Sequence, residues 1–168
     1  MTSRHLVFHD LGAAGRWYWV DAASAEAIVE AVAEVEVITD PAAHRMVSKW
    51  TVPSVALDGD LGPLEPLRAK RTRQRADPGF APLTGRSPVY LRFPGDPELL
   101  YELGPDGRAL REVRVWSSGA GSRIDMAGEP INPPFDLWDP AYVPLEVERD
   151  VFEAAWLSAP GNPSTTVT

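Results

Sequence analysis

The stretch Ser24-Ala25-Glu26-Ala27-Ile28-Val29-Glu30-Ala31-Val32-Ala33 has the clearest pattern in this 168-residue chain. Its apolar residues at positions 25, 28, 29, 32 and 33 recur at helical spacing, while Glu26 and Glu30 line the opposite face. Ser24 is a suitable N-cap because its hydroxyl can accept a hydrogen bond from a free amide of the first turn. The stretch therefore predicts an amphipathic helix.

Extended segments are predicted on both sides of this helix. Residues 4–10 and 17–20 have the composition of two strands joined by a glycine-containing turn, and residues 35–39 alternate as a third strand. Asp40-Pro41 has the form of a second helix start, with that helix reaching about Trp50. The first half is therefore predicted to be a β-β-α-β-α unit, followed by an edge strand over residues 51–57.

The second half is predicted to be an antiparallel β-meander with a C-terminal helix. The predicted strands cover residues 88–93, 99–103, 109–116 and 122–127, and Gly104-Pro105-Asp106-Gly107 forms a hairpin turn between the second and third. A proline-rich loop follows over residues 128–144, and residues 143–148 are predicted to form a last short strand. Asp150 is expected to cap the final helix, with Glu153 at capping-box spacing.

The pattern as a whole predicts an α+β fold with two domains. The N-terminal domain is predicted to span residues 1–86 and to include a basic connector at 68–86. The C-terminal antiparallel domain is predicted to span 87–160, and the polar residues 161–168 form a flexible tail.

Charge is unevenly distributed along the chain. The formal net charge is −8, from 24 acidic and 16 basic residues. Residues 1–67 carry 4 bases and 10 acids, residues 68–86 carry 6 bases and 1 acid, and residues 87–168 carry 6 bases and 13 acids. Two acidic bodies joined by a basic segment argue against general nucleic-acid binding and are compatible with a basic partner.

Several classes of protein are not supported by the composition. The chain has no cysteine, so it has no disulfide and no thiolate chemistry. The sequence has no signal-peptide pattern and no run of 18 apolar residues, so we expect a cytoplasmic protein with no membrane partner.

The basic run over residues 68–75 is the most unusual stretch. It holds five cationic side chains, namely Arg68, Lys70, Arg71, Arg73 and Arg75. On a helix they leave little apolar face, so the segment is predicted to be largely solvated or to lie across a charged surface. It can clamp the two acidic halves together, contact RNA phosphates, or bind an acidic patch of a protein partner.

Two further groups of residues are candidate binding sites. Trp17 and Trp19 share one face of a strand, which is either a core face or an exposed platform for stacking. Asp136 and Asp139 flank Trp138 in the proline-rich loop, with Asp125 and Glu129 preceding them. A pair of acids beside an aromatic ring resembles a small glycosidase cleft, and the alternative is turn-forming aspartates beside a packed indole.

No cofactor, metal site or complete catalytic constellation is predicted. His5 and His9 have an i, i+4 spacing that suits a metal on a helix, but on a strand they stand roughly 13 Å apart. The chain contains neither a phosphate-binding glycine loop nor a nucleophile motif.

The C-terminal half resembles a small bacterial domain family of unknown function. The likeness rests on six stretches in a fixed order. They are the opening strand Val89-Tyr90-Leu91, the stretch Pro97 to Leu103, the turn Gly104-Pro105-Asp106-Gly107, the stretch Arg111 to Trp116, the proline-rich segment Pro130-Ile131-Asn132-Pro133-Pro134, and a closing helix with Phe152 and Trp156. The resemblance implies a compact antiparallel sheet with one C-terminal helix, and it supplies no catalytic residue.

These observations together predict a non-enzymatic, cytoplasmic protein-binding module. The leading hypothesis is an immunity or antitoxin-like inhibitor of a basic toxin or effector, which an acidic surface attracts electrostatically. One alternative is an RNA-associated module that uses residues 68–75 with Trp17 and Trp19. Another is a small hydrolase that uses Asp136 or Asp139. Oligomeric state is not indicated by the sequence.

Overall fold

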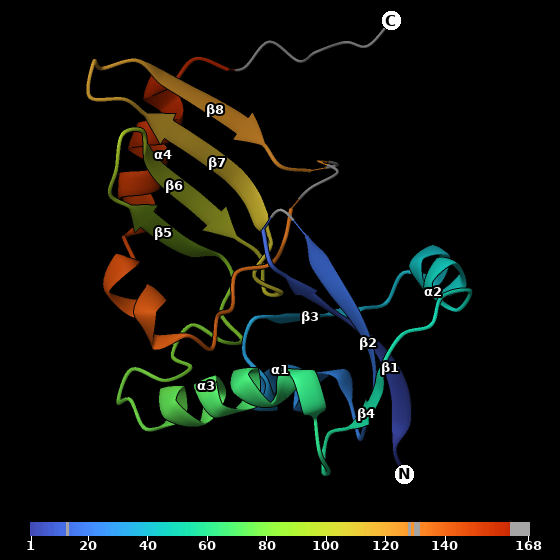
Figure 1. Cartoon of the computed structure of the whole chain (residues 1–168). Coiled ribbons are helices and arrows are strands. Elements are labelled where there is room, and N and C mark those ends of the chain that lie inside the picture. Colours follow the sequence, from blue (N-terminus) through green and yellow to red (C-terminus); the bar gives the residue numbers. More distant parts are fainter. Residues whose placement is uncertain (13, 128, 130–131, 162–168) are drawn as a thin grey trace, which may run out of the picture. The chain divides into compact units, whose positions relative to one another are not determined.

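The computed structural model describes residues 1–12, 14–127, 129 and 132–161, so most of the predicted tail lies outside the described residues. Helices and strands are mixed, at 28% and 31% of the chain, which confirms the predicted α+β class. The chain divides into two compact units, Met1–Phe80 and Ala81–Thr168 (Figure 1). Each unit has its own sheet and its own core, and each is described by itself below.

The first unit contains a four-stranded sheet and three α-helices. Its elements in chain order are β1 (Ser3–Asp10), β2 (Gly15–Ala22), α1 (Ala25–Ala31), β3 (Val35–Ile38), α2 (Pro41–Val47), β4 (Ser54–Ala56), the short 3-10 helix η1 (Gly62–Leu64) and α3 (Glu65–Arg75). The strand order is β3-β1-β2-β4. Only β4 runs parallel to its neighbour, and it lies at an edge as predicted for the segment containing Pro53.

Helix α1 forms where the sequence predicts it, and its cap explains its start. The Ser24 hydroxyl accepts a hydrogen bond from the amide of Ala27 at 3.1 Å. Three of the five residues of the predicted apolar stripe are buried, with Ile28, Val32 and Ala33 at most 1% exposed, and the other two are half-buried. The helix is nevertheless shorter than the stripe, because Val32 already has an extended backbone.

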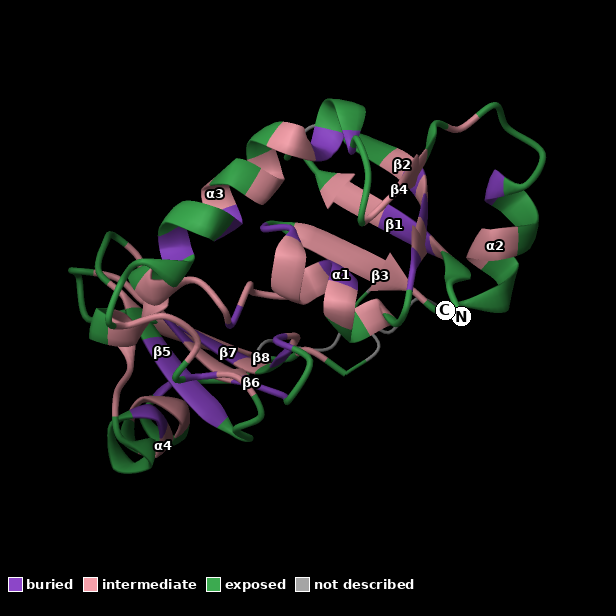
Figure 2. Ribbon diagram, turned by 90° about the horizontal axis from the view of Figure 1, so that it is seen from below, coloured by how far each residue is buried: buried purple, intermediate pink, exposed green. Residues whose placement is uncertain are grey.

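The two faces of the first sheet are covered by different helices. On one face, Val7, Tyr18 and Val20 pack with Ile28 of α1 and with the segment leading into α3. On the other face, α2 packs against the sheet, where the rings of Trp19 and His44 are 5.5 Å apart. Figures 1 and 2 show α1 and α3 on one side of this sheet and α2 on the other.

The second unit is an antiparallel meander, as predicted. Its elements are β5 (Val89–Phe93), β6 (Glu98–Leu103), β7 (Ala109–Val115), β8 (Gly121–Asp125), the 3-10 helix η2 (Pro140–Leu145) and α4 (Arg149–Ser158). The strand order β5-β6-β7-β8 follows the chain.

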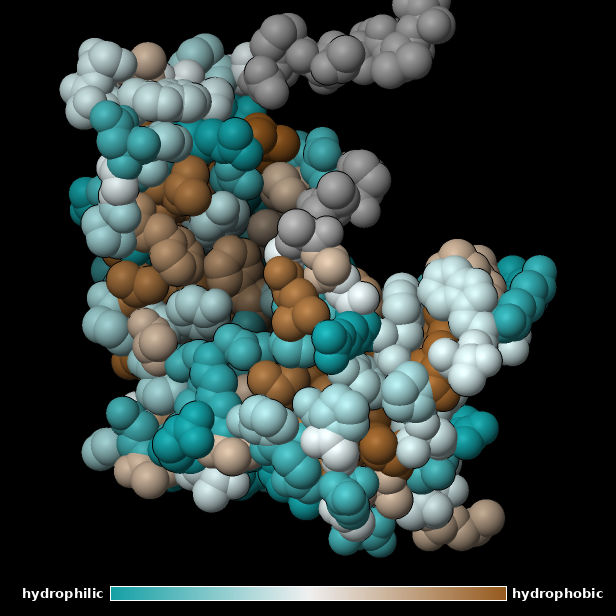
Figure 3. Space-filling model, viewed as in Figure 1, coloured by the Kyte–Doolittle hydropathy of each residue, from teal (hydrophilic) through white to brown (hydrophobic). Residues whose placement is uncertain are grey.

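Both faces of the second sheet carry apolar side chains. One face packs against α4, where Leu100 and Val113 meet Phe152. The other packs against the segment before α4, where Leu91 and Leu103 meet Leu137. Hydrophobic side chains gather over this sheet in Figure 3.

The turn between β6 and β7 requires glycine at position 107. Gly107 has a φ of +81°, in the left-handed region that favours glycine. A Cβ atom there would stand 2.2 Å from the carbonyl oxygen of Phe135. The amide of Phe135 donates to the Gly107 carbonyl at 2.9 Å, so this turn also holds the loop that precedes η2.

Two predictions about the C-terminal region are wrong. Residues 143–148 do not form a strand, because Pro140 and Pro144 lie in η2 and the Asp139 side chain caps its start by accepting from the amide of Ala141 at 2.9 Å. Asp150 is not the N-cap of the last helix. The helix begins at Arg149 with Glu148 before it, so Asp150 lies in its first turn.

Candidate functional site

The basic segment over residues 68–75 lies on α3, and its central arginine is buried rather than solvated. Arg71 is 1% exposed. Its Nη2 donates to the carbonyl oxygens of Val29 at 3.0 Å and Val32 at 3.3 Å, and its Nη1 donates to the Gln74 side chain at 2.9 Å. The carbonyls at the end of α1 have no partner within their helix, so Arg71 caps α1 from a neighbouring helix. The prediction of a largely solvated helix is wrong at this position.

The other basic side chains of α3 differ in their surroundings. Arg75 pairs with Glu30 at 3.0 Å, and Lys70 pairs with Glu34 at 2.6 Å. Arg68 donates to the carbonyl oxygens of Leu57 and Gly59, whereas Arg73 is exposed and pairs with no described carboxylate. All of these contacts, like those of Arg71, lie within the first unit, so they join α3 to α1 and to the segment after β4.

Trp17 and Trp19 share one face of β2, as predicted, and both are half-buried. Trp19 packs against His44 of α2 and has the Arg4 guanidinium 5.8 Å from its ring centroid. Trp17 lies 4.7 Å from the ring of Phe8 and 6.4 Å from that of Trp50. The face is therefore partly a core face and partly an aromatic surface.

The carboxylates of the proline-rich loop are used locally. Asp136 accepts a hydrogen bond from the amide of Trp138 at 3.2 Å, and Asp139 accepts one from the amide of Ala141. Both hydrogen bonds shape the backbone that leads into η2. This arrangement matches the interpretation of Asp136 and Asp139 as turn-forming residues beside a half-buried Trp138.

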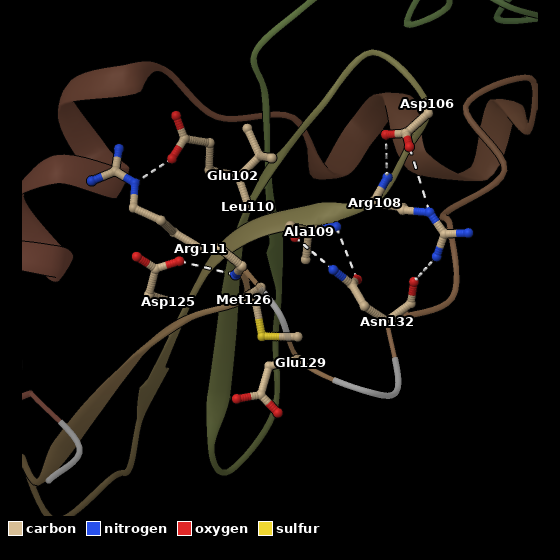
Figure 4. A pocket seen from close by; sticks show the side chains of 11 residues that line it. Glu102, Asp106, Arg108, Ala109, Leu110, Arg111, Asp125, Met126, Glu129 and Asn132 are labelled. Atoms are coloured by element: carbon tan, nitrogen blue, oxygen red, sulfur yellow. Dashed lines mark hydrogen bonds and ion pairs between the residues drawn. The ribbon is translucent and has the colours of Figure 1, made fainter. Parts of the chain in front are cut away.

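A hollow of about 570 Å³ opens in the second unit, where the β6–β7 turn and the loop after β8 meet the start of β7 (Figure 4). It is lined by residues from β6, the turn, β7, β8 and the following loop, namely Glu102, Asp106, Arg108, Ala109, Leu110, Arg111, Asp125, Met126, Ala127, Glu129 and Asn132. Figure 4 shows Arg111 and Asp125 on one side, Arg108 and Asn132 on the other, and Met126 between them.

One wall of this hollow is held by the side chain of Asn132. Its amide nitrogen donates to the carbonyl oxygen of Ala109 at 2.8 Å, and its amide oxygen accepts from the amide of the same residue at 3.1 Å. Arg108 adds a hydrogen bond from its guanidinium to the main-chain carbonyl of Asn132. The amide side chain therefore pairs with β7 as a neighbouring strand would, and it holds the backbone at Asn132 against the sheet.

The arginines of the hollow are neutralised by acidic neighbours. Arg111 forms ion pairs with Glu102 and, at 2.6 Å, with Glu153 of α4, and its guanidinium lies 4.9 Å from the ring centroid of Phe152. The hydrogen bonds from Arg111 lower the pKa of Glu153 below its ordinary value. Arg108 lies 3.5 Å from a carboxylate oxygen of Asp106.

Two carboxylates of the hollow have no cationic partner among the described residues. Asp125 and Glu129 are exposed, and neither forms an ion pair within the described part of the chain. Leu110, which is 44% exposed, and the half-buried Met126 add apolar surface beside them. The hollow thus combines negative charge with apolar contact area.

The two units differ in net charge. Residues 1–80 carry 9 bases and 11 acids, a net charge of −2, and residues 81–168 carry 7 bases and 13 acids, a net charge of −6. The second unit, which contains the hollow, is therefore the acidic one, and the basic segment belongs with the first.

Only part of this hollow is predicted from the sequence. Asp125 and Glu129 stand out there as carboxylates, but they are grouped with Asp136 and Asp139. Asn132 and Arg108 are not predicted, because their roles depend on contacts between residues more than twenty positions apart in the chain. The one sequence feature that draws attention to Asn132 is its position within the proline-rich segment.

Comparison with known proteins gives no match to a family model, a curated protein or a solved structure. In the described residues, no group of three or more histidine, aspartate or glutamate side chains is placed to hold a metal ion. The helices of that same part of the chain are all too short or too polar to cross a membrane.

Proposed function

We propose that this protein is a cytoplasmic protein-binding module of the immunity or antitoxin-like kind, and that its second unit receives a basic side chain of a partner protein. The hollow beside β7 is the observation that carries the proposal. Two carboxylates that form no ion pair with the described residues stand there beside Leu110 and Met126. A lysine or arginine side chain has a charged head and an aliphatic stem, so it can satisfy both parts of such a site.

The charge of the second unit supports the same proposal at longer range. A net charge of −6 over 88 residues attracts a basic protein and raises its association rate, and this attraction weakens as salt screens it. The hollow then supplies the short-range contact that a general acidic surface lacks. The first partner to test is a basic toxin or effector whose gene lies next to the gene for this protein.

The test is binding of the neighbouring gene's product to the full chain, at low and high salt. The variant Asp125→Asn/Glu129→Gln should weaken binding roughly tenfold and flatten its salt dependence, because it removes two charges that face the partner. The control Glu26→Gln/Asp58→Asn removes the same charge from carboxylates of the first unit. Equal effects of the two variants would show that the hollow contributes to binding only through the net charge of the surface.

A biological readout complements the binding measurement. Co-expression of the intact chain should restore growth to cells that produce the neighbouring protein, and the Asp125→Asn/Glu129→Gln variant should restore it less well than the control. If the neighbouring gene's product does not bind this chain and cell growth does not depend on it, the inhibitor proposal is wrong.

A further inference from the structure

The outward side of α2 carries a second surface with a different chemistry. His44 and Val47 face the sheet, and Val47 is fully buried. Arg45 and Met46 lie on the exposed side, and Lys49 follows one turn after Arg45. Figure 2 shows this helix as exposed and half-buried in turn, with a single buried segment.

An aromatic row continues this surface onto the sheet. Trp50 follows α2, and its ring meets that of Trp17 edge to face, while Trp17 in turn contacts Phe8. Trp50 is 49% exposed and Met46 is 44% exposed. Single exposed apolar side chains are common on protein surfaces, but exposed apolar side chains that lie together mark interaction sites, and tryptophan and methionine are enriched in protein interfaces. We call Phe8, Trp17, Arg45, Met46, Lys49 and Trp50 the α2 surface.

The positive charges of the α2 surface are not neutralised by described neighbours. Arg45 and Lys49 are exposed, and their side chains form no ion pair or hydrogen bond within the residues that the structure describes. Asp40 at the start of α2 accepts a hydrogen bond from the amide of Ala42. Glu36 of β3 lies opposite Phe8 and has a partner of its own. By contrast, four of the five bases of α3 contact groups of the same unit.

We propose that the α2 surface binds a segment of a partner protein in which carboxylate side chains stand beside apolar ones. Two cations next to an apolar row complement such a segment in charge and in hydrophobicity. A single-stranded nucleic acid fits less well, because base stacking needs several exposed rings, whereas Trp17 and Phe8 are half-buried and only Trp50 in this row belongs to the exposed residues. The chain's net charge of −8 also opposes a long polyanion.

This surface is separate in residues and in charge from the hollow of the second unit. The hollow attracts cations, whereas the α2 surface attracts anions, so each proposal can be tested without the other. A variant in one of them leaves the other chemically intact.

The experiment selects peptides from a random library displayed on phage, using the intact full chain as bait. Selected peptides should be enriched in aspartate or glutamate beside tryptophan, phenylalanine or leucine. Their affinity should fall roughly tenfold for Arg45→Glu/Lys49→Glu and for Trp50→Ala, because either change removes one half of the complementarity. The controls are Arg73→Glu, which reverses one charge at an exposed base of α3 without a described carboxylate partner, and Leu157→Ala, at an exposed leucine of the second unit.

Each alternative occupant gives a distinct result in the same set of variants. Enrichment of basic peptides, no enrichment, or peptides that bind the variants as well as the intact chain would overturn the proposal. Salt-sensitive quenching of tryptophan fluorescence by oligo(dT), lost in Trp50→Ala, would assign the surface to nucleic acid instead. Self-association that disappears in Arg45→Glu/Lys49→Glu would assign it to a second copy of the chain.

Discussion

The Nη2 atom of Arg71 lies 3.0 Å from the carbonyl oxygen of Val29, so an arginine in the middle of α3 caps the C-terminal end of α1. The two residues are 42 positions apart in the chain. The guanidinium is almost completely buried, and its hydrogen bonds to carbonyl groups take the place of a glycine C-cap. A residue within a strongly basic run is therefore part of the core of the first unit.

Replacing Arg71 with alanine should destabilise the first unit by about 3 kcal/mol, because buried carbonyl oxygens and the Gln74 amide lose a charged partner. Hydrogen exchange at the amides of α1 should report this loss directly, without requiring the two units to unfold together. The Arg73→Ala variant, on an exposed position of the same helix, should change protection by less than about 0.5 kcal/mol. Similar effects of the two variants would contradict the capping role.

Two glycines with a left-handed backbone, Gly107 and Gly119, should respond differently to substitution by alanine. Gly107→Ala should destabilise the second unit by more than about 3 kcal/mol, because it adds a clash with Phe135 to the cost of a left-handed backbone. Gly119 has a φ of +83° but open space around it, so Gly119→Ala should cost only about 1 kcal/mol. Urea unfolding of the two variants measures the difference, and equal losses would show that the clash relaxes.

Asn132 is expected to hold the wall of the hollow through its two hydrogen bonds with Ala109. Asn132→Ala should cost about 2 kcal/mol and should raise the exchange rate of the Ala109 amide. Asn132→Asp keeps the acceptor for that amide but loses the donor to the carbonyl, so the amide should remain protected more than in the alanine variant. An Ala109 amide that stays equally protected in both variants would show that other contacts hold the loop.

Acid should weaken the attachment of α4 to the sheet. The pKa of Glu153 is lowered by hydrogen bonds from Arg111, so the unfolded chain binds a proton at this group more readily than the folded chain. The pair's contribution is complete above the ordinary pKa of 4.5 and is lost as pH falls through the lowered value. Exchange protection of α4 should therefore decline over that acidic range.

The Glu153→Gln variant isolates this contribution. It should be less stable than the intact chain by about 1 kcal/mol at neutral pH, and the difference should shrink as the medium is acidified. Asp150→Asn, on the same helix at a carboxylate without an ion pair in the described residues, is the control. A difference that persists unchanged at low pH would assign the stability to packing of the side chain rather than to its charge.

The parts of the fold that depend on local signals could be predicted from the sequence. Ser24 begins α1, Trp17 and Trp19 share a face, and Pro53 marks an edge strand, because each effect is set by neighbouring residues. The capping by Arg71 could not be predicted, since its acceptors are backbone carbonyls that have no side-chain signature. The wall made by Asn132 could not be predicted for the same reason, because its partner is the main chain of Ala109.

The order of the elements also has a consequence for synthesis of the chain. All four strands of the first sheet precede α3, because β4 ends at Ala56 and α3 begins at Glu65. During synthesis, α1 therefore lacks its Arg71 cap, and one apolar face of the sheet lacks the side chain of Leu67. Both are supplied only when these residues have left the ribosome. A chain that stalls when the strands have emerged and α3 is still inside the ribosome exposes aggregation-prone surface, so slow translation at that stage should increase the need for chaperones.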